Sequence, residues 1–386
     1  MAANSAAPGS REGRRHLMNK TSFLLLATAI PMWAQPATPQ DELIRLVRQG
    51  QYVQVRQAAA KLIEEAAQSA TKSATKPAKG LPYRAGLQQL LGLAEANFGH
   101  FAEAERAFEH GIELCGRSQP AAPETLVSLL VSLAETHTTQ AHFRQADLAL
   151  RRAGQTAAGL SSDHPLRASI FDGWGVFYLA QRKGSQAEAS FRRALAILEQ
   201  HLGPHDPQVA SEANGLASLL VSMGRQSEAL PLIERGRNVL LESHGPNHPE
   251  TFFATYLLGR VQIESAPAEA EKMLRAAIEA WRTTQPERHT NLAMLLNALA
   301  SARHRQGDLA EAIALGSQAL AISRDLLGPE HPRVMDQLYE RAQLLKAAKR
   351  GKEAAALKKE ADRIRAQLGD SEPGRHTIDI RALRGR

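Results

Sequence analysis

The chain has 386 residues, of which 43% are hydrophobic and 5% aromatic, and it carries a formal net charge of +7. Cys115 is the single cysteine, which excludes an intramolecular disulfide and a multi-cysteine zinc site. The basic charge does not predict nucleic-acid binding. Much of the excess lies in residues 1–20 and 68–82, and no basic stripe alternates with aromatic residues.

Residues 1–37 are expected to form an N-terminal extension and a signal peptide. The apolar run Thr21–Ala34 follows basic residues and is too short for a stable membrane span. The signal would occupy about residues 18–34, with translation starting at Met1 or Met18. We therefore expect an exported protein, periplasmic or extracellular. The alternative is a protein anchored in the membrane by an uncleaved N-terminal segment.

Three further segments flank the central part of the chain. Residues 38–67 read as an atypical helix pair that caps one end of the core. Residues 68–81 are rich in Ser, Thr, Lys and Ala without an apolar pattern, which predicts a linker. Residues 369–386 lose the pattern of the preceding chain and are expected to form a disordered tail.

Residues 82–368 contain seven repeats of about 42 residues. Prolines that can open a helix recur at this spacing, with Asn291 in the one place that lacks a proline. Small residues recur further along each repeat, and three columns of them run through the chain: Gly92, Ala134, Gly175, Ala217, Leu258, Ala300 and Ala342; Ala104, Ala146, Ala187, Ala229, Ala270, Ala312 and Ala354; Gly111, Ala153, Ala194, Gly236, Ala277, Ala319 and Ala361. All of these residues except Leu258 are Ala or Gly.

These columns predict paired helices. Two helices approach closely only where their side chains are small, and proline is tolerated at the first helical position. Residues before the prolines are placed to cap the helices: His164, Asp206, His248 and His331. Gly224 and Gly307 follow a first helix, where a left-handed turn suits glycine. The sequence therefore predicts an all-α fold, a right-handed α-solenoid of antiparallel helix pairs.

The segments between repeats resemble a known family. LGPHDPQVA at 202, GPNHPET at 245 and LGPEHPRV at 327 are similar to tetratricopeptide repeats of the kinesin light chain-like subclass, whose repeats are about 42 residues long. The sequence departs from that pattern at Leu258, Asn291 and Gly316. The resemblance implies a tetratricopeptide (TPR) superhelix that binds proteins.

The sequence offers little for catalysis, cofactors or metals. It contains no phosphate-binding loop, dinucleotide fingerprint, nucleophile elbow or zinc-protease motif. His164, His248 and His331 recur at repeat junctions and are better explained as capping residues. Cys115 is expected to be a partly buried thiol. We therefore predict a protein that is not an enzyme and has no catalytic, cofactor or metal site.

The remaining candidate is the concave groove lined by the first helix of each pair. In the resembled family, Asn in this groove holds the main chain of an extended peptide, and Asn214 and Asn297 fall at such places. The alternative is that both are solvated or bond a neighbouring helix. His304 and Arg305, near one end, are expected to favour acidic ligand residues. Helical spacing places these further residues in the groove: Gln89, Ser128, Asp172, Ser211, Ser218, Thr255, Gln262 and Ser301.

We therefore expect an exported, non-catalytic scaffold that binds protein partners or extended peptides in its concave groove. It would bind no nucleic acid and would have no stable membrane span after signal cleavage. The alternative is an envelope assembly or enzyme-accessory factor that acts through its convex face and self-association. Apolar exposure on the second helices, for example at Trp281 or Leu315, would favour that alternative.

Overall fold

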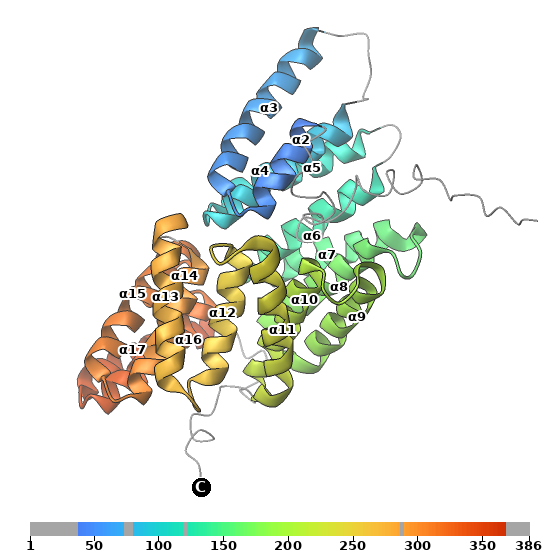
Figure 1. Cartoon of the computed structure of the whole chain (residues 1–386). Coiled ribbons are helices and arrows are strands. Elements are labelled where there is room, and N and C mark those ends of the chain that lie inside the picture. Colours follow the sequence, from blue (N-terminus) through green and yellow to red (C-terminus); the bar gives the residue numbers. More distant parts are fainter. Residues whose placement is uncertain (1–37, 73–79, 119–121, 286–288, 368–386) are drawn as a thin grey trace, which may run out of the picture.

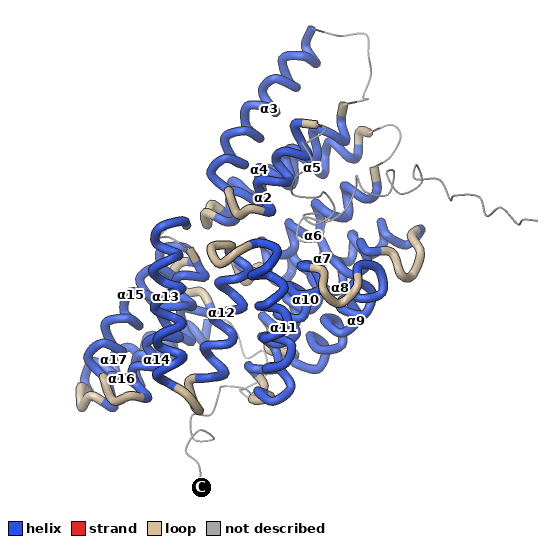
Figure 2. Tube along the Cα trace, viewed as in Figure 1, coloured by secondary structure: helices blue, strands red, loops and turns tan. Residues whose placement is uncertain are grey.

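A computed structural model describes residues 38–72, 80–118, 122–285 and 289–367. This part of the chain forms 16 α-helices and one short 3-10 helix, and it contains no strand (Figure 2). The predicted signal peptide, half of the predicted linker and the predicted tail lie outside the described residues. No helix among the described residues has the length and apolar character needed to cross a membrane.

The helices form successive pairs along the chain (Figure 1). The N-terminal pair is α2 (Pro39–Arg48) and α3 (Tyr52–Lys72). The first helices of the seven repeats are α4 (Leu81–Asn97), α6 (Pro123–Thr139), α8 (Pro165–Ala180), α10 (Pro207–Ser222), α12 (Pro249–Gln262), α14 (Thr290–Arg305) and α16 (Pro332–Ala347). The second helices are α5 (Phe101–Gly116), α7 (Phe143–Thr156, followed by η2, Ala157–Gly159), α9 (Gly184–Leu202), α11 (Gln226–His244), α13 (Pro267–Thr284), α15 (Leu309–Leu327) and α17 (Gly351–Gln367).

The predicted capping residues begin the first helices. His164 Nδ1 accepts the Leu166 N–H at 3.2 Å, and the side chain of Asp206 accepts the N–H two residues on at 2.8 Å. His248 and His331 cap in the same way, at 3.3 and 3.1 Å. The repeat that lacks a proline uses the same device, because His289 Nδ1 accepts the Asn291 N–H at 3.0 Å. Helix α14 therefore begins at Thr290, with a cap that was not predicted.

The columns of small residues mark the places where paired helices meet. The second column is fully buried from Ala104 to Ala312, and Ala354 at the C-terminal end is 8% exposed. A Cβ added to Gly92 would stand 2.5 Å from the Phe108 ring, and one added to Gly175 would stand 2.6 Å from the Phe191 ring. Each glycine thus admits an aromatic side chain from the second helix of its own repeat. The prediction of closely packed helix pairs is confirmed.

The turn inside a repeat contains a left-handed residue in six of the seven repeats, and the turn between α12 and α13 is the exception. Gly224 and Gly307 have φ values of +76° and +89°, as predicted from their position. Ala141, Arg182 and Lys349 adopt the same conformation in their repeats, at φ of 60° to 61°. The geometry of the stack imposes this turn even where the sequence supplies no glycine.

The first helices lie on the inner side of the curved stack. From α4 to α12, each first helix packs against the first helix of the next repeat as well as against its own second helix. Neighbouring second helices make no comparable contact. Because the stack is tighter on the side of the first helices, it curves around them. The described residues therefore form the predicted all-α solenoid.

Turns of the N-terminal repeats touch the C-terminal repeats. A Cβ at Gly50 would stand 2.8 Å from Pro249 Cδ, and one at Gly99 would stand 2.5 Å from Leu326 Cδ2. The Thr139 carbonyl accepts a hydrogen bond from His331, and Arg182 pairs with Asp336 at 2.5 Å. Thr139 and His331 lie 192 positions apart in the sequence, and Arg182 and Asp336 lie 154 positions apart. The stack thus closes on itself and encloses its inner surface.

The N-terminal pair packs against the first repeat. Leu43, Val47 and Val55 share a buried cluster with Leu87 and Leu90 of α4. Helix α3 continues to Lys72, so the expected linker at 68–81 is wrong over its first residues. Its start, QSATK, extends a helix that is already nucleated, and Ser, Thr and Ala do not stop a helix as Pro or Gly does.

Candidate functional site

The structure places some predicted groove residues inside the helix packing. Asn214 is 1% exposed and Thr255 is 6% exposed, so the prediction that they line an open groove is wrong. The Asn214 Oδ1 atom lies 3.0 Å from where a Cβ of Gly236 would stand, because it fills the space beside that glycine on α11. Thr255 donates to the Thr251 carbonyl at 2.8 Å. Gln89 and Ser128 are likewise buried, at 2% and 3% exposure.

The predicted residues of α14 lie near the surface but already have partners. Asn297 is half-buried, and its side-chain amide donates to Glu340 on α16. Ser301 is exposed and donates to the Asn297 carbonyl at 3.1 Å. Arg305 is exposed and pairs with Glu264, so its charge is balanced within the chain. His304 is exposed beside it.

The other predicted residues lie on α8, α10 and α12. Ser211 is half-buried and donates to Glu250 at 2.7 Å. Ser218 and Gln262 are half-buried. Asp172 is half-buried. Among the predicted groove residues, it alone belongs to a cluster of carboxyls whose pKa values are raised.

That cluster, here called the acidic wall, consists of Glu135, Asp172 and Glu212 on three consecutive first helices. Burial, followed by the charge of Asp172, raises the pKa of Glu135 to about 8 and that of Glu212 well above its usual range. Burial raises the pKa of Asp172 to about 6. Asp172 and Glu212 share a hydrogen bond, which requires a proton on one of the two carboxyls. Glu212 is 7% exposed, and its Oε1 atom has no hydrogen-bond partner.

Charged residues of α12 and α16 form a second group, here called the paired wall: Arg260, Arg333, Asp336 and Glu340. Arg260 donates a hydrogen bond to the Tyr256 hydroxyl at 3.2 Å. Its positive charge favours the ionised form of Glu340. The charge of Asp336 favours the ionised form of Arg333. Asp336 also pairs with Arg182 across the closed stack. Burial raises the pKa of Glu340. The hydrogen bond from Asn297 and the charge of Arg260 partly oppose this rise. Both carboxyls of this wall thus have a partner in the same chain, Arg182 for Asp336 and Asn297 for Glu340.

Of the three carboxyls of the acidic wall, only Asp172 was predicted from the sequence, and Glu135 and Glu212 were missed. A signal was present, because consecutive first helices each carry one acidic residue toward the middle or end of the helix. These residues stand at different positions in their repeats, so the comparison of repeats by column did not align them. Only the packing of α6, α8 and α10 brings the three carboxyls together.

A group of His244, His248 and Glu250 lies where α11 meets α12. Ligand atoms of the three residues lie within 4.8 Å of one another, although a Gly-Pro pair separates the two histidines in sequence. His248 Nδ1 accepts the Glu250 N–H, so the proton of the neutral ring is on Nε2. The capping bond therefore occupies the lone pair with which His248 would hold a metal. Burial raises the pKa of Glu250 to about 7.

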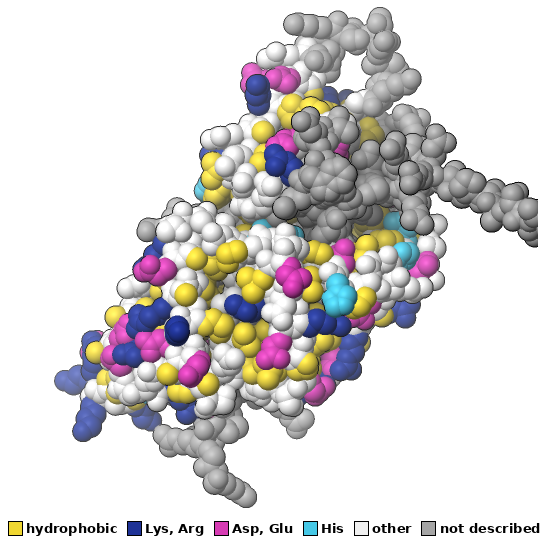
Figure 3. Space-filling view, in the orientation of Figure 1, with side chains coloured by type: hydrophobic (Ala, Val, Ile, Leu, Met, Phe, Trp, Pro, Cys, Tyr) yellow, Lys and Arg dark blue, Asp and Glu magenta, His cyan; other side chains and the backbone are white. Residues whose placement is uncertain are grey.

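The two residues of the second helices named for a convex-face function are buried, although Leu148 on α7 is 60% exposed. Trp281 is fully buried against Phe252, with ring centroids 4.9 Å apart, and Leu315 is 9% exposed. Cys115 is buried more completely than expected, at 6% exposure, and burial raises the pKa of its thiol to about 11. The visible outer face mixes acidic and basic side chains, with Lys and Arg gathered toward the α17 end (Figure 3).

Two comparisons with sequences bear on this architecture. The tetratricopeptide repeat signature matches residues 166–242, 213–283 and 291–367, about half of the chain. A relative from Arabidopsis thaliana, the protein KINESIN LIGHT CHAIN-RELATED 3, is 22% identical over 259 residues. The match covers 64% of this chain and 38% of the relative, so the chain spans well under two thirds of that relative's length.

Solved structures show the same fold at low sequence identity. A Rap protein complexed with competence and sporulation factor has a TM-score of 0.55 at 12% identity, over 75% of this chain and 78% of that chain. NprR in complex with its cognate peptide NprX has a TM-score of 0.52 at 13% identity, over 73% and 81%. Together with the repeat signature and the closed stack of helix pairs, these findings identify the chain as a member of the tetratricopeptide repeat family, of the kinesin light chain-like kind.

Proposed function

We propose that the protein is an exported, non-catalytic scaffold that binds an extended segment of a protein partner against the inner surface of its first helices. The repeats suggest an interaction scaffold. Two structural relatives of this fold are described as complexes with peptides or with a competence and sporulation factor, which supports the proposal. The observation that carries it is the acidic wall, a set of enclosed carboxyls held close together on three first helices.

The chemistry of that wall indicates the kind of segment. The carboxyls are enclosed and repel one another, so each gains from a neighbouring positive charge. In the described part of the chain, no Lys or Arg forms an ion pair with Glu135, Asp172 or Glu212. A Lys or Arg side chain, or an amino terminus, would supply charge-assisted hydrogen bonds there. We therefore propose a cationic residue in the bound segment, in place of the acidic one first expected at His304 and Arg305.

Proton release should accompany this binding. Because burial raises the pKa of Glu135 to about 8 and that of Glu212 well above its usual range, these two carboxyls carry protons at neutral pH in the absence of a bound cation. A cation binds the ionised carboxylates and displaces those protons. The affinity for a cationic segment should therefore rise as the pH increases from 6 to 8, and the affinity for a neutral segment should not.

The test is an affinity capture with residues 38–386 beside a variant in which Glu135→Gln, Asp172→Asn and Glu212→Gln remove the acidic wall. A partner identified by mass spectrometry and bound through the inner surface is retained by the wild type and lost from this variant. Synthetic peptides from that partner then give the affinity, and replacing their Lys or Arg by Gln should weaken binding by at least about tenfold.

A matched control neutralises exposed carboxylates of the second helices, with Glu234→Gln, Glu242→Gln and Glu279→Gln. This variant should retain the partner. Loss of the partner from the control variant alone would contradict the proposal and favour the convex face. Circular dichroism shows whether each triple variant remains helical.

Export rests on the sequence of residues 18–34. Deletion of this segment should leave the protein in the cytoplasmic fraction, whereas the full chain should appear in the periplasm or medium with a shortened N-terminus. An N-terminus that is intact on protein recovered with the membrane would support the anchored alternative instead.

A further inference from the structure

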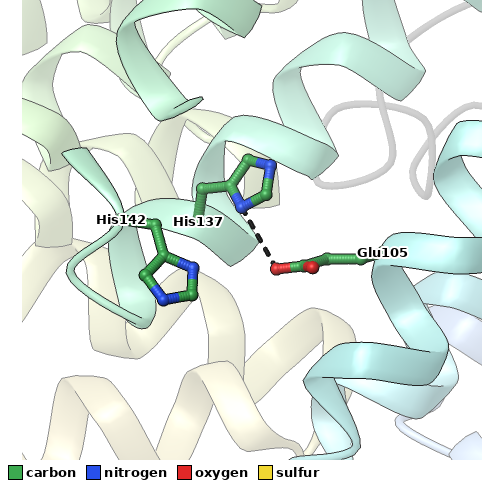
Figure 4. Close-up of side chains that lie close together, drawn as sticks. All are labelled: Glu105, His137 and His142. Carbon is green, nitrogen blue, oxygen red and sulfur yellow. Dashed lines mark ion pairs between the residues drawn. The ribbon is translucent and has the colours of Figure 1, made fainter. Parts of the chain in front are cut away.

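Three side chains with metal-binding atoms meet at one edge of the stack (Figure 4). Glu105 lies on α5, His137 lies near the end of α6, and His142 lies in the turn before α7. Their ligand atoms all lie within 4.8 Å of one another. His137 Nδ1 is 3.1 Å from Glu105 Oε1, and the three residues come from two helices and the turn that follows one of them. His137 lies on α6, two residues after Glu135 of the acidic wall, whereas Glu105 and His142 belong to other elements.

The two histidines differ from those that cap helices. His248, His289 and His331 each use Nδ1 to accept a backbone N–H, so that lone pair is occupied. His142 precedes α7 but makes no side-chain capping bond. His137 Nδ1 is buried, and its approach to Glu105 is not aligned as a hydrogen bond. Each ring therefore keeps a nitrogen with which to bind a cation.

The local backbone holds this group in place. The His142 N–H donates to the His137 carbonyl at 2.8 Å, which fixes the separation of the two residues. Ala141, between them, has a left-handed conformation at φ of 61°. The Gln140 side-chain amide donates to Glu105 Oε1, which orients the carboxylate from outside the group. Such outer hydrogen bonds are the usual support of metal-binding side chains.

The spacing suits a small divalent ion. Ligands about 2.1 Å from a tetrahedral zinc stand about 3.4 Å apart, so the group needs to contract by roughly 1 Å. His142 is exposed and can supply that movement by a change of rotamer, whereas His137 is buried and fixed. Two imidazoles with one carboxylate are a ligand set that zinc accepts, with a fourth position left to water.

We propose that Glu105, His137 and His142 form a binding site for one divalent transition-metal ion, Zn²⁺ in particular, at the edge of the second repeat. The bound ion would tie α5 to the turn between α6 and α7. Thr139 in that segment accepts the hydrogen bond from His331, so the ion would also stiffen the place where the two ends of the stack meet.

The experiment is a titration of the purified, chelator-treated full chain with Zn²⁺, followed by calorimetry, and with Co²⁺, followed by its visible absorption. We expect one equivalent to bind at pH 7.5, with weaker binding at pH 5.5 because protons compete for the imidazoles. His142→Ala and Glu105→Gln should each weaken binding by at least about tenfold. Both side chains can be replaced without opening the core, since His142 is exposed and Glu105 is half-buried.

Two control variants separate this site from other histidines. His205→Ala changes an exposed histidine outside either group and should leave the affinity unchanged. His244→Ala tests the second group and should also leave it unchanged. The proposal is overturned if the Glu105→Gln/His142→Ala double variant still binds one equivalent with wild-type affinity, or if His244→Ala abolishes binding. Circular dichroism confirms that each variant is folded.

Discussion

The acidic wall and the paired wall are built from the same kind of helix but treat charge differently. On α12 and α16, Arg260 acts on Glu340, and Asp336 pairs with Arg182. On α6, α8 and α10, carboxyls face other carboxyls and their pKa values rise. The charges of the paired wall stabilise the closed stack. The carboxyls of the acidic wall would instead be stabilised by a cation from a bound partner. Residue type alone does not distinguish them.

The acidic wall and two buried capping histidines should respond to pH in opposite directions. Carboxyls with raised pKa values hold more protons in the folded chain, so the stability of the acidic wall falls as the pH rises from 4.5 to about 8. His289 and His331 have pKa values lowered to about 4 by burial. Their contribution is fully present above pH 6.5 and is lost as the pH falls toward 4.

Removing one charge from the acidic wall should give the largest change in stability. Glu212→Gln keeps the shape of the side chain and removes a buried acid, so we expect the free energy of unfolding to rise by about 2 kcal/mol at pH 8. At pH 5 the gain should shrink because the wild-type carboxyls already hold protons. Urea unfolding at the two pH values measures the difference. An equal gain at both values would mean that Glu212 does not titrate in this range.

Breaking the closure of the stack should have a smaller effect. His331→Asn can retain the cap of α16, since Asn is a good capping residue, but loses the hydrogen bond to Thr139. We expect it to cost about 1 kcal/mol more than His164→Asn, which changes a capping histidine of α8. Thermal unfolding of both variants at pH 7.5 gives the comparison. Equal losses would show that the contact with Thr139 contributes nothing.

The ion pair across the closure should contribute less again. Arg182 and Asp336 are both about half exposed, at 43% and 48% of their side chains. A double-mutant cycle with Arg182→Ala and Asp336→Ala should give a coupling free energy of at most about 1 kcal/mol, which decreases with added salt. A larger coupling that salt leaves unchanged would place this pair among the enclosed charges of the interior.

The smallest effect is expected for Asn214. Its amide is buried beside Gly236, so Asn214→Ala should leave the affinity for a partner peptide unchanged within about twofold. Asn297→Ala removes a half-buried amide and its hydrogen bond to Glu340, and it serves as the comparison. A large loss of affinity in Asn214→Ala, with a helical spectrum retained, would show that α10 and α11 separate when the partner binds.

Much of the fold was predictable because local rules repeat along the chain. Prolines and capping residues determined where six of the seven first helices begin, and small residues at fixed spacing determined where helices cross. The left-handed turns at Ala141, Arg182 and Lys349 were not predictable, since no glycine marks them. The extension of α3 to Lys72 was missed because a weakly helical sequence continues a helix once it has formed.

The sequence by itself determined the solenoid of helix pairs, since periodicity and small residues act between neighbours in the chain. Only the tertiary structure decided which polar residues reach the inner surface. Asn214 and Asn297 hold the same place in their repeats, yet one fills the gap beside Gly236 and the other bonds Glu340. The acidic wall, the group around His137 and the contact of Thr139 with His331 all join separate helices. Their geometry depends on how the stack curves and closes, which is the sum of many small packing rotations rather than a property of any one repeat.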